Sequence, residues 1–335
     1  MLEKNVLGKT SLELTQFGIG ATGIAGMYTE VHRLQAMEAL ELAWTKGVRY
    51  FDVAPFYGFG LGERRMGDFL RAQPRDTFVI STKVGRLLRP SNPPPAKERF
   101  YRTTMPFDIE FDYSYDGAMR SIEDSLQRLG LNRIDIALIH DIDTLTHGKT
   151  AQPIAFQQAM KGAYKALEQL RSEGVIAAIG LGVNEWEVCS DALDYGDFDC
   201  FLLAGRFTLL EQTPLHTLLP QCLERSVSLI IGGIFNTGLL ANPYAENLKY
   251  DYGPASAEKI AKAREIATVC ESFGIPLGAA ALQYPLRHPA VATVISGARS
   301  GKEVSEIIQW MDREIPAALW DKLTALNLIA AIDNL

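Results

Sequence analysis

Four polar residues stand at the ends of apolar, strand-like runs of this chain, and their types suit proton transfer. Asp52 lies in one such run and Tyr57 just beyond it, while Lys83 and His140 end the next two runs. Polar residues at the carboxyl ends of different parallel strands build the active sites of (β/α)8 barrels. A tyrosine, a lysine, an aspartate and a histidine held together suit hydride chemistry on a carbonyl or an alcohol.

Tyr57 would need a cation beside it to act near neutral pH, because a phenol has a pKa of about 10. Lys83 is the candidate cation. Two charges about 4 Å apart at an effective dielectric near 20 interact by roughly 4 kcal/mol, which would lower the pKa of Tyr57 by about two to three units. We expect Asp52 to keep Lys83 charged and His140 to hydrogen-bond the substrate oxygen. Singly, each has a commoner structural role, such as a helix N-cap or a solvated charge.

Strand-like and helix-like runs alternate along the whole chain. The predicted strands span residues 15–20, 50–54, 77–84, 134–140, 175–183, 200–205, 227–234 and 291–297. The predicted helices span residues 31–47, 62–72, 115–129, 155–173, 185–195, 215–225, 256–273 and 301–312. Eight strands alternating with helices predict parallel βα units. We therefore expect an α/β fold, a single (β/α)8 TIM barrel over residues 1–335.

Three segments fall outside this alternation. Residues 5–12, with Gly8 in the turn, predict a short hairpin that could plug the bottom of the barrel. Residues 87–114 follow the third strand and are rich in proline and aromatic residues. Such long loops are usually functional, so we expect a substrate lid, with a decorated surface loop as the alternative. Residues 313–335 carry a predicted helix over 316–329, which either docks on the barrel or contacts a partner.

Composition excludes several classes of function. The net charge of −7 without a basic run disfavours nucleic acid and anionic membranes as partners. The amino terminus has no apolar signal segment. Four widely spaced cysteines without a CxxC pair argue against a metal or redox site and predict a reducing cytoplasm. The oligomeric state is left open.

The motifs around these residues resemble those of the aldo-keto reductase family. The matching stretches are 52–58 with 61–63, 81–85 and 136–140, and the resemblance covers about residues 5–312. It implies a (β/α)8 barrel and a nicotinamide cofactor bound without a Rossmann domain. It also implies Tyr57 as general acid and base, Lys83 and Asp52 as its tuning pair, and His140 as the ligand of the substrate oxygen.

Within that family the chain is similar to the aldose 1-dehydrogenase branch, with pyridoxal 4-dehydrogenase close by, on residues 86–90, 202–210 and 231–238. This resemblance implies oxidation of a small sugar lactol, such as L-fucose or D-arabinose, at carbon 1 to the lactone. Pyridoxal oxidation to 4-pyridoxolactone is the alternative, and a nicotinamide-binding regulatory barrel without turnover is a second one. The candidate substrate-pocket residues are Tyr28, Phe56 and Trp186, the last of which could equally anchor a helix.

The resemblance also assigns the cofactor. Asn184 matches the family's carboxamide-binding asparagine, although a turn or helix cap is an alternative role, and residues 295–300 match its adenine-nucleotide loop before a helix amino terminus. The expected cofactor-binding residues are Gly20, Ala21, Thr22, Asp52, Asn184, Gly232, Phe235, Gly238, Ser296, Gly297, Arg299 and Glu303.

Two substitutions in this loop favour NAD over NADP. Gly297 and Glu303 occupy the places of a usual lysine and arginine. A glutamate repels a 2′-phosphate and can accept a hydrogen bond from the ribose 2′-hydroxyl, although Arg299 could still reach a phosphate. Gly232 replaces the usual nicotinamide-stacking tyrosine, and Phe235 or Phe207 could substitute for it.

One rival fold and one rival function have weaker support. Residues 18–23 form a literal GxGxxG after a strand, as in a Rossmann fingerprint. However, the helical period begins only near Val31. A metal-dependent barrel hydrolase needs several histidine and aspartate ligands, and the chain has five histidines and no HxH after the first strand.

Overall fold

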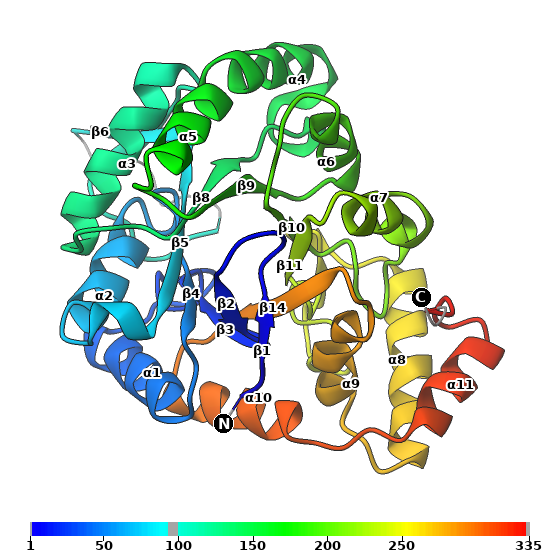
Figure 1. The fold of residues 1–335 in the computed structure, drawn as a ribbon. Coiled ribbons are helices and arrows are strands. Elements are labelled where there is room, and N and C mark those ends of the chain that lie inside the picture. The colour runs from blue at the N-terminus through cyan, green and yellow to red at the C-terminus, as the bar shows by residue number, and fades with distance from the viewer. Residues whose placement is uncertain (1, 93–99, 333–335) are drawn as a thin grey trace.

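The computed structural model describes residues 2–92 and 100–332, and at its centre lies a closed barrel of parallel strands (Figure 1). In barrel order the strands are β3 (Phe17–Gly20), β4 (Tyr50–Asp52), β5 (Val79–Val84), β8 (Ile136–His140), β9 (Ala178–Val183), β10 (Cys200–Ala204), β11 (Ser228–Gly232) and β14 (Val291–Gly297). β14 pairs with β3 and closes the ring. The predicted eight-stranded barrel is confirmed, and the Rossmann alternative is wrong.

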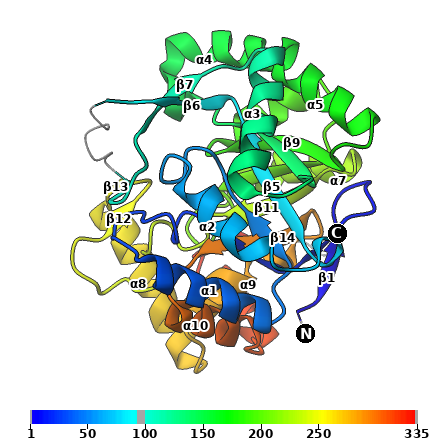
Figure 2. The same ribbon diagram turned by 90° about the vertical axis from the view of Figure 1, so that its left-hand side faces the viewer.

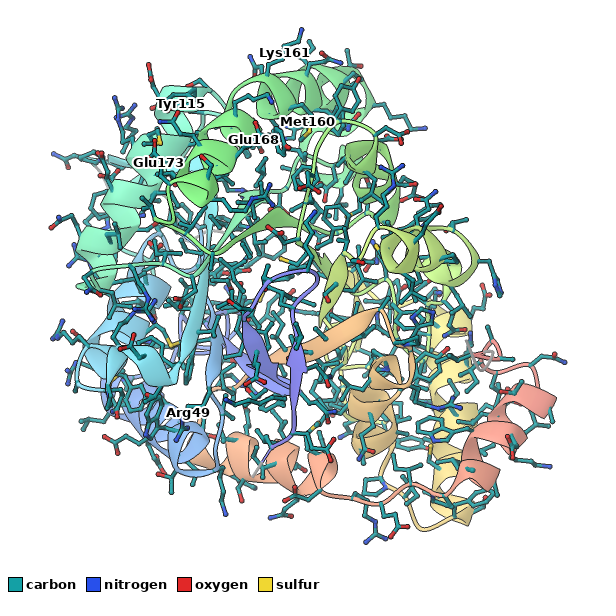
Figure 3. The ribbon with its side chains drawn as sticks, viewed as in Figure 1. Arg49, Tyr115, Met160, Lys161, Glu168 and Glu173 are labelled. Atoms are coloured by element: carbon teal, nitrogen blue, oxygen red, sulfur yellow. The ribbon has the colours of Figure 1, made fainter. Side chains whose placement is uncertain are left out.

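Helices form a ring around the barrel (Figure 1). They are α1 (Arg33–Thr45), α2 (Leu61–Leu70), α3 (Tyr115–Leu129), α4 (Thr144–Lys161), α5 (Ala163–Ser172), α6 (Trp186–Leu193), α7 (Leu218–Glu224), α8 (Ala257–Ser272), α9 (Leu277–Gln283), α10 (Gly301–Met311) and α11 (Ala317–Ala325). Most of them turn apolar residues toward the barrel and polar residues to solvent. On α4, for example, Met160 is buried and Lys161 is exposed (Figure 3).

Two helices differ from the prediction. Residues 155–173, predicted as one helix, belong to α4 and α5, which meet at Gly162. A Cβ atom at Gly162 would lie 2.5 Å from the carbonyl oxygen of Tyr113, so the chain passes too close there for a side chain. Helix α9 was not predicted. All but one of its residues are buried, so it has no polar face from which a helical period could be read.

The amino-terminal hairpin closes one end of the barrel. Strands β1 (Lys4–Val6) and β2 (Glu13–Thr15) pair antiparallel, as expected, with Gly8 in the left-handed region at φ +54°. Leu7 and Leu14 are fully buried and share a cluster with inward barrel residues. The hairpin therefore supplies the apolar floor of the barrel.

The opposite end of the barrel is covered by long connections. Figure 2 shows β6 (Arg86–Pro90) with β7 (Phe107–Phe111), and β12 (Lys249–Tyr250) with β13 (Gly253–Pro254), at the end away from β1. The segment expected as a loop over 87–114 is thus built largely on an antiparallel hairpin. Its residues 93–99 lie outside the described residues.

Helix α11, the last predicted helix, lies beside α8 on the barrel exterior (Figure 1). The Trp320 ring centroid is 6.1 Å from that of Tyr284, which places the helix on the barrel's own helices. Residues 333–335 of the expected extension lie outside the described residues. In the described part of the chain no single helix is long and apolar enough to cross a membrane, although the bent pair 257–272 and 277–287 passes that test by length and composition.

We expect the hairpin floor to be a major source of stability. Leu14→Ala should lower the free energy of unfolding by about 2–5 kcal/mol, because it leaves a cavity among fully buried side chains. Urea denaturation followed by circular dichroism measures this change. A loss below about 0.5 kcal/mol, as is usual for surface substitutions, would show that the hairpin is not part of the core.

Candidate active site

The barrel strands bring the four expected catalytic side chains to one end. Asp52 and His140 are the last residues of β4 and β8, and Lys83 is the penultimate residue of β5. Tyr57 lies in the turn after β4, where its backbone N–H donates to Ala54. The Tyr57 ring centroid is 4.6 Å from Lys83 Nζ and 6.0 Å from the His140 ring centroid. Parallel strands in register therefore place these side chains within contact of one another.

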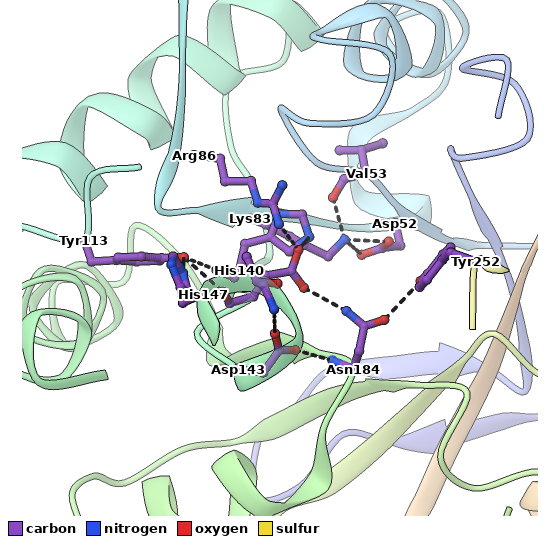
Figure 4. A network of polar contacts seen from close by, with 12 residues as sticks. Asp52, Val53, Lys83, Arg86, Tyr113, His140, Asp143, His147, Asn184 and Tyr252 are labelled. Carbon is purple, nitrogen blue, oxygen red and sulfur yellow. Dashed lines mark hydrogen bonds and ion pairs between the residues drawn. The ribbon is translucent and has the colours of Figure 1, made fainter. Parts of the chain in front are cut away.

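Lys83 and Asp52 form an ion pair inside the barrel, with both side chains 1% exposed. Lys83 Nζ donates to Asp52 Oδ1 at 2.9 Å, to Asp52 Oδ2 at 2.8 Å and to the carbonyl oxygen of Val53 at 2.9 Å (Figure 4). Ser81 Oγ donates to Asp52 Oδ1 at 2.7 Å. Burial raises the pKa of Asp52, and Lys83 opposes that rise. The ammonium thus has three fixed acceptors and one orientation.

Tyr57 has a pKa well above the ordinary value of a phenol. Burial is the largest cause, the charges of Asp52 and Asp141 add to it, and Arg86 opposes it. The expectation that Lys83 lowers this pKa is wrong for the protein alone. Asp52 neutralises Lys83, so the pair presents little net charge to the ring while protein surrounds the phenol. Tyr57 is therefore a protonated phenol at neutral pH.

His140 is a neutral imidazole. Burial lowers its pKa well below 6.5, and the cations Arg86 and Lys83 lower it further. Its Nε2 lies 3.3 Å from Asp141 Oδ2, and among the described residues its buried Nδ1 has no hydrogen-bond partner. A carboxylate this close favours the proton on Nε2.

Three further residues join the site that the sequence did not single out for it. Arg86, at the start of β6, forms an ion pair with Asp141, the residue after His140. Asp141 Oδ1 accepts a hydrogen bond from Asn184 Nδ2 at 3.1 Å, and Asn184 Oδ1 accepts one from the Tyr252 hydroxyl at 3.0 Å (Figure 4). Arg86 and Asp141 directly adjoin the lysine and histidine motifs, which is the signal that could have found them. Tyr252 lies in a loop that is distant in sequence, and no sequence signal pointed to it.

A cavity of about 480 Å³ opens beside Tyr57. Of the expected cofactor-binding residues it is lined by Gly20, Thr22, Asp52, Asn184, Gly232, Phe235, Gly238, Ser296, Gly297, Arg299 and Glu303, and it is also lined by Tyr28. Ala21 is fully buried and is not part of the lining. Phe56 stands outside the lining but packs next to Tyr57, 5.6 Å from Tyr101 between ring centroids. Trp186 packs on the core at the start of α6, which favours the helix-anchor role.

The lining suits an elongated cofactor with an amide at one end and phosphates at the other. The Asn184 amide and Tyr57 lie at one part of the lining, and the amino terminus of α10 lies at another. Gly20 and Gly238 line the cavity wall. A Cβ atom added at either glycine would meet no other atom closer than 3.9 Å, so the backbone at both positions borders open space. Cavities of roughly 300–1,000 Å³ are typical of cofactor sites. In the described part of the chain no group of three or more His, Cys, Asp or Glu residues is arranged to hold a metal ion.

Comparison with known proteins places this geometry in a family. Residues 16–328 match the aldo/keto reductase family. Pyridoxal 4-dehydrogenase of Microbacterium luteolum is 42% identical over 337 residues, covering 98% of both chains. D-threo-aldose 1-dehydrogenase of a Pseudomonas species is 37% identical over 324 residues, covering 95% of both chains. An aldo-keto reductase from Bacillus halodurans, solved in its holo form, superposes with a TM-score of 0.77 at 23% identity, covering 100% of this chain and 99% of that one.

The buried ion pair should govern stability as well as chemistry. Lys83→Met should lower the free energy of unfolding by about 3–5 kcal/mol, because it leaves the Asp52 carboxylate buried without a cation. Adding Asp52→Asn should recover part of that loss, since neither position then carries a buried charge. Urea titrations of the single and double variants measure both effects. Equal unfolding midpoints for Lys83→Met and the wild type would contradict the prediction.

Proposed function

The chain belongs to the aldo/keto reductase family, and on this basis we propose that it is an NAD-dependent dehydrogenase that oxidises the ring hemiacetal carbon of a small molecule to a lactone. The observation that carries the proposal is the cavity lined by Tyr57, Asp52 and Asn184 at the carboxyl ends of the strands. Both similar dehydrogenases are named for substrates that form cyclic hemiacetals, an aldose and pyridoxal. Oxidation of such a carbon gives a lactone in either case.

Tyr57 is proposed to exchange the proton of the substrate hydroxyl. When bound, the nicotinamide accepts the hydride and brings a positive charge to the site. In the protein alone burial and two carboxylates hold the Tyr57 pKa high, so the phenol is ready to act as an acid toward a carbonyl. In the oxidative direction it must first release its proton to solvent through the cavity that it lines, and added positive charge favours that release.

Lys83 and His140 are proposed to orient the reacting groups. Lys83 is fixed by three acceptors, so its ammonium stays 4.6 Å from the Tyr57 ring. Because Asp52 neutralises Lys83, a developing phenolate would depend on the positive charge that the bound cofactor brings. His140 is neutral and adds no charge beside the substrate oxygen. Its one N–H, on Nε2 and 3.3 Å from Asp141 Oδ2, would be shared between that carboxylate and the substrate oxygen. The substrate oxygen would lie between the Tyr57 hydroxyl and this imidazole.

Two substrates of this class are candidates. A small sugar lactol, such as L-fucose or D-arabinose, is oxidised at carbon 1, in line with the similarity to D-threo-aldose 1-dehydrogenase. Pyridoxal is the second candidate, in line with the similarity to pyridoxal 4-dehydrogenase. The aromatic side chains of Tyr28, Tyr57 and Tyr252 line the cavity. Aromatic side chains of this kind suit a flat ring.

The segment 87–114 is proposed to act as a lid on this site. The backbone N–H of Tyr28 donates to the carbonyl oxygen of Phe100 at 2.6 Å, and Met105 donates to Gly58 at 3.1 Å. The ring centroids of Phe100 and Tyr252 are 5.3 Å apart. These contacts join the segment to three other connections at the same end of the barrel.

NAD is proposed as the preferred cofactor. Glu303 accepts hydrogen bonds from the backbone N–H and from Nε of Arg299, both at 2.8 Å. Glu303 therefore neutralises the charge of Arg299. The Glu303 carboxylate lies at the cavity wall, where a bound 2′-phosphate would need a cation. This pairing supports NAD over NADP.

The first experiment follows NADH formation by absorbance, with NAD and a panel of L-fucose, L-galactose, D-arabinose and pyridoxal. We expect turnover of one substrate, and mass spectrometry should find a product lighter by two hydrogen atoms. Tyr57→Phe should reduce kcat by about 10²- to 10⁴-fold, as expected for loss of a general acid and base, with an unchanged Kd for NADH and an unchanged melting temperature. No turnover with NAD or NADP, together with measurable cofactor binding, would favour a regulatory nicotinamide-binding role instead.

The cofactor preference can be tested separately. Glu303→Gln should lower the Kd for NADP relative to the Kd for NAD by about tenfold, equal to roughly 1.4 kcal/mol. The substitution removes a negative charge and leaves Arg299 free of its ion pair. Glu258→Gln removes an exposed carboxylate at the start of α8 and is the matched control for net charge. Fluorescence titration gives both constants. An unchanged ratio in Glu303→Gln would remove Glu303 from the explanation of cofactor choice.

A further inference from the structure

We propose that Asp141 is a positioning residue whose single carboxylate holds the substrate-side imidazole of His140 and the cofactor-side amide of Asn184 in fixed relation to each other. The proposal rests on the dehydrogenase function proposed above. It assigns a role to an acidic side chain that contacts both His140, on the substrate side of the site, and Asn184, on the cofactor side. Neither the active-site motifs nor the Tyr57, Lys83 and Asp52 cluster requires this residue.

The contacts of Asp141 divide between its two oxygens. Oδ1 accepts from Asn184 Nδ2 at 3.1 Å. Oδ2 forms the ion pair with Arg86 and lies 3.3 Å from His140 Nε2. A carboxylate has enough acceptor sites to serve all three donors at once. An asparagine amide has one acceptor oxygen and one donor nitrogen, so it cannot serve all three.

Each of these contacts has a consequence for the neighbouring group. The carboxylate beside His140 favours the proton on Nε2 and limits rotation of the ring. The bond from Asn184 Nδ2 fixes which end of that amide is the acceptor, and Oδ1 then faces the Tyr252 hydroxyl at 3.0 Å. One side chain therefore sets the donor and acceptor pattern on both sides of the site.

The backbone supports a functional role. Asp141 has φ +48°, in the left-handed region, and its N–H donates to the carbonyl oxygen of Gly182 at 2.9 Å. Tyr252, at the other end of the same chain of contacts, has φ +65°. Non-glycine residues held in this region cost free energy and gather at active sites and ligand clamps. Asparagine tolerates the left-handed region as well as aspartate does, so Asp141→Asn preserves the turn.

Charged and titratable groups face Asp141 from every side. They are Arg86 on β6, Lys83 on β5, His140 on β8, Asp143 in the following loop, His147 on α4, and the hydroxyls of Tyr57, Tyr101, Tyr113 and Tyr252. Burial raises the pKa of Asp141 to about 6, although Arg86 opposes the rise. Protonation below that pH removes the ion pair with Arg86. Burial and the cations Arg86 and Lys83 lower the pKa of His140 well below 6.5.

The test measures NADH affinity and kcat for Asp141→Asn and for a matched buried pair at the other end of the barrel. Asp135 precedes β8, is buried like Asp141, and pairs with Arg75 at 2.7 Å. We expect Asp141→Asn to raise the Kd for NADH about fivefold, as for one lost hydrogen bond, and to lower kcat by about 10- to 100-fold. Asp135→Asn should lower the melting temperature and leave Kd and kcat unchanged.

The pH profile of binding separates positioning from a structural role. In the wild type the Kd for NADH should rise as the pH falls through about 6, because protonated Asp141 loses its charge. Asp141→Asn should show no such rise and should bind at pH 8 as weakly as the wild type does near pH 5. This readout does not depend on turnover, so it is informative even if no substrate of the panel is oxidised.

The double variant Arg86→Gln/Asp141→Asn distinguishes lost positioning from an orphaned charge. We expect it to remain impaired in kcat and in NADH affinity. Recovery of both toward wild-type values would show that the single variant fails only because Arg86 is left buried without a partner, and would overturn the proposal. Wild-type Kd, kcat and pH profile in Asp141→Asn would overturn it directly.

Discussion

The ion pair between Lys83 and Asp52 is the interaction on which the rest of the site depends. Both side chains are 1% exposed, and neither charge would be stable there alone, because an unpaired buried charge costs several kcal/mol. The pair requires β4 and β5 to be adjacent and in register, with Asp52 opposite Ser81 and Lys83 two residues further on. The closed barrel supplies that register, and the apolar floor made by Leu7 and Leu14 keeps water from the other end.

Neutralisation within this pair explains the proton affinity of the site. Asp52 neutralises the charge of Lys83, so Tyr57 retains its proton. Asp141 likewise neutralises much of the charge of Arg86. Two buried cations thus coexist with a neutral His140. The site resists deprotonation of the phenol until further positive charge arrives beside it. Its readiness to give or to take a proton is therefore set by what binds in the adjoining cavity.

The active-site end is assembled from connections that are distant in sequence. The segment after β3 contributes Tyr28, the β6–β7 region contributes Phe100, and the β12–β13 region contributes Tyr252 and Lys249. Phe100 contacts Tyr28 and Tyr252, and Lys249 Nζ lies 4.0 Å from the centroid of the Tyr28 ring. The strands hold the reacting residues rigidly, while these connections determine the shape of the space above them.

The sequence alone determined the barrel and the place of its reacting residues, because parallel strands leave apolar runs with a polar residue at the carboxyl end. The same pattern predicted Asp52, Lys83 and His140 at one end of the barrel. It missed α9, which is buried on nearly all sides, and the break at Gly162, which depends on a backbone 49 positions away at Tyr113. Only the tertiary structure decided the direction of the Tyr57 pKa and the link from Arg86 through Asp141 and Asn184 to Tyr252. Burial and pairing of charges depend on which distant side chains meet, and no local pattern of residues records that.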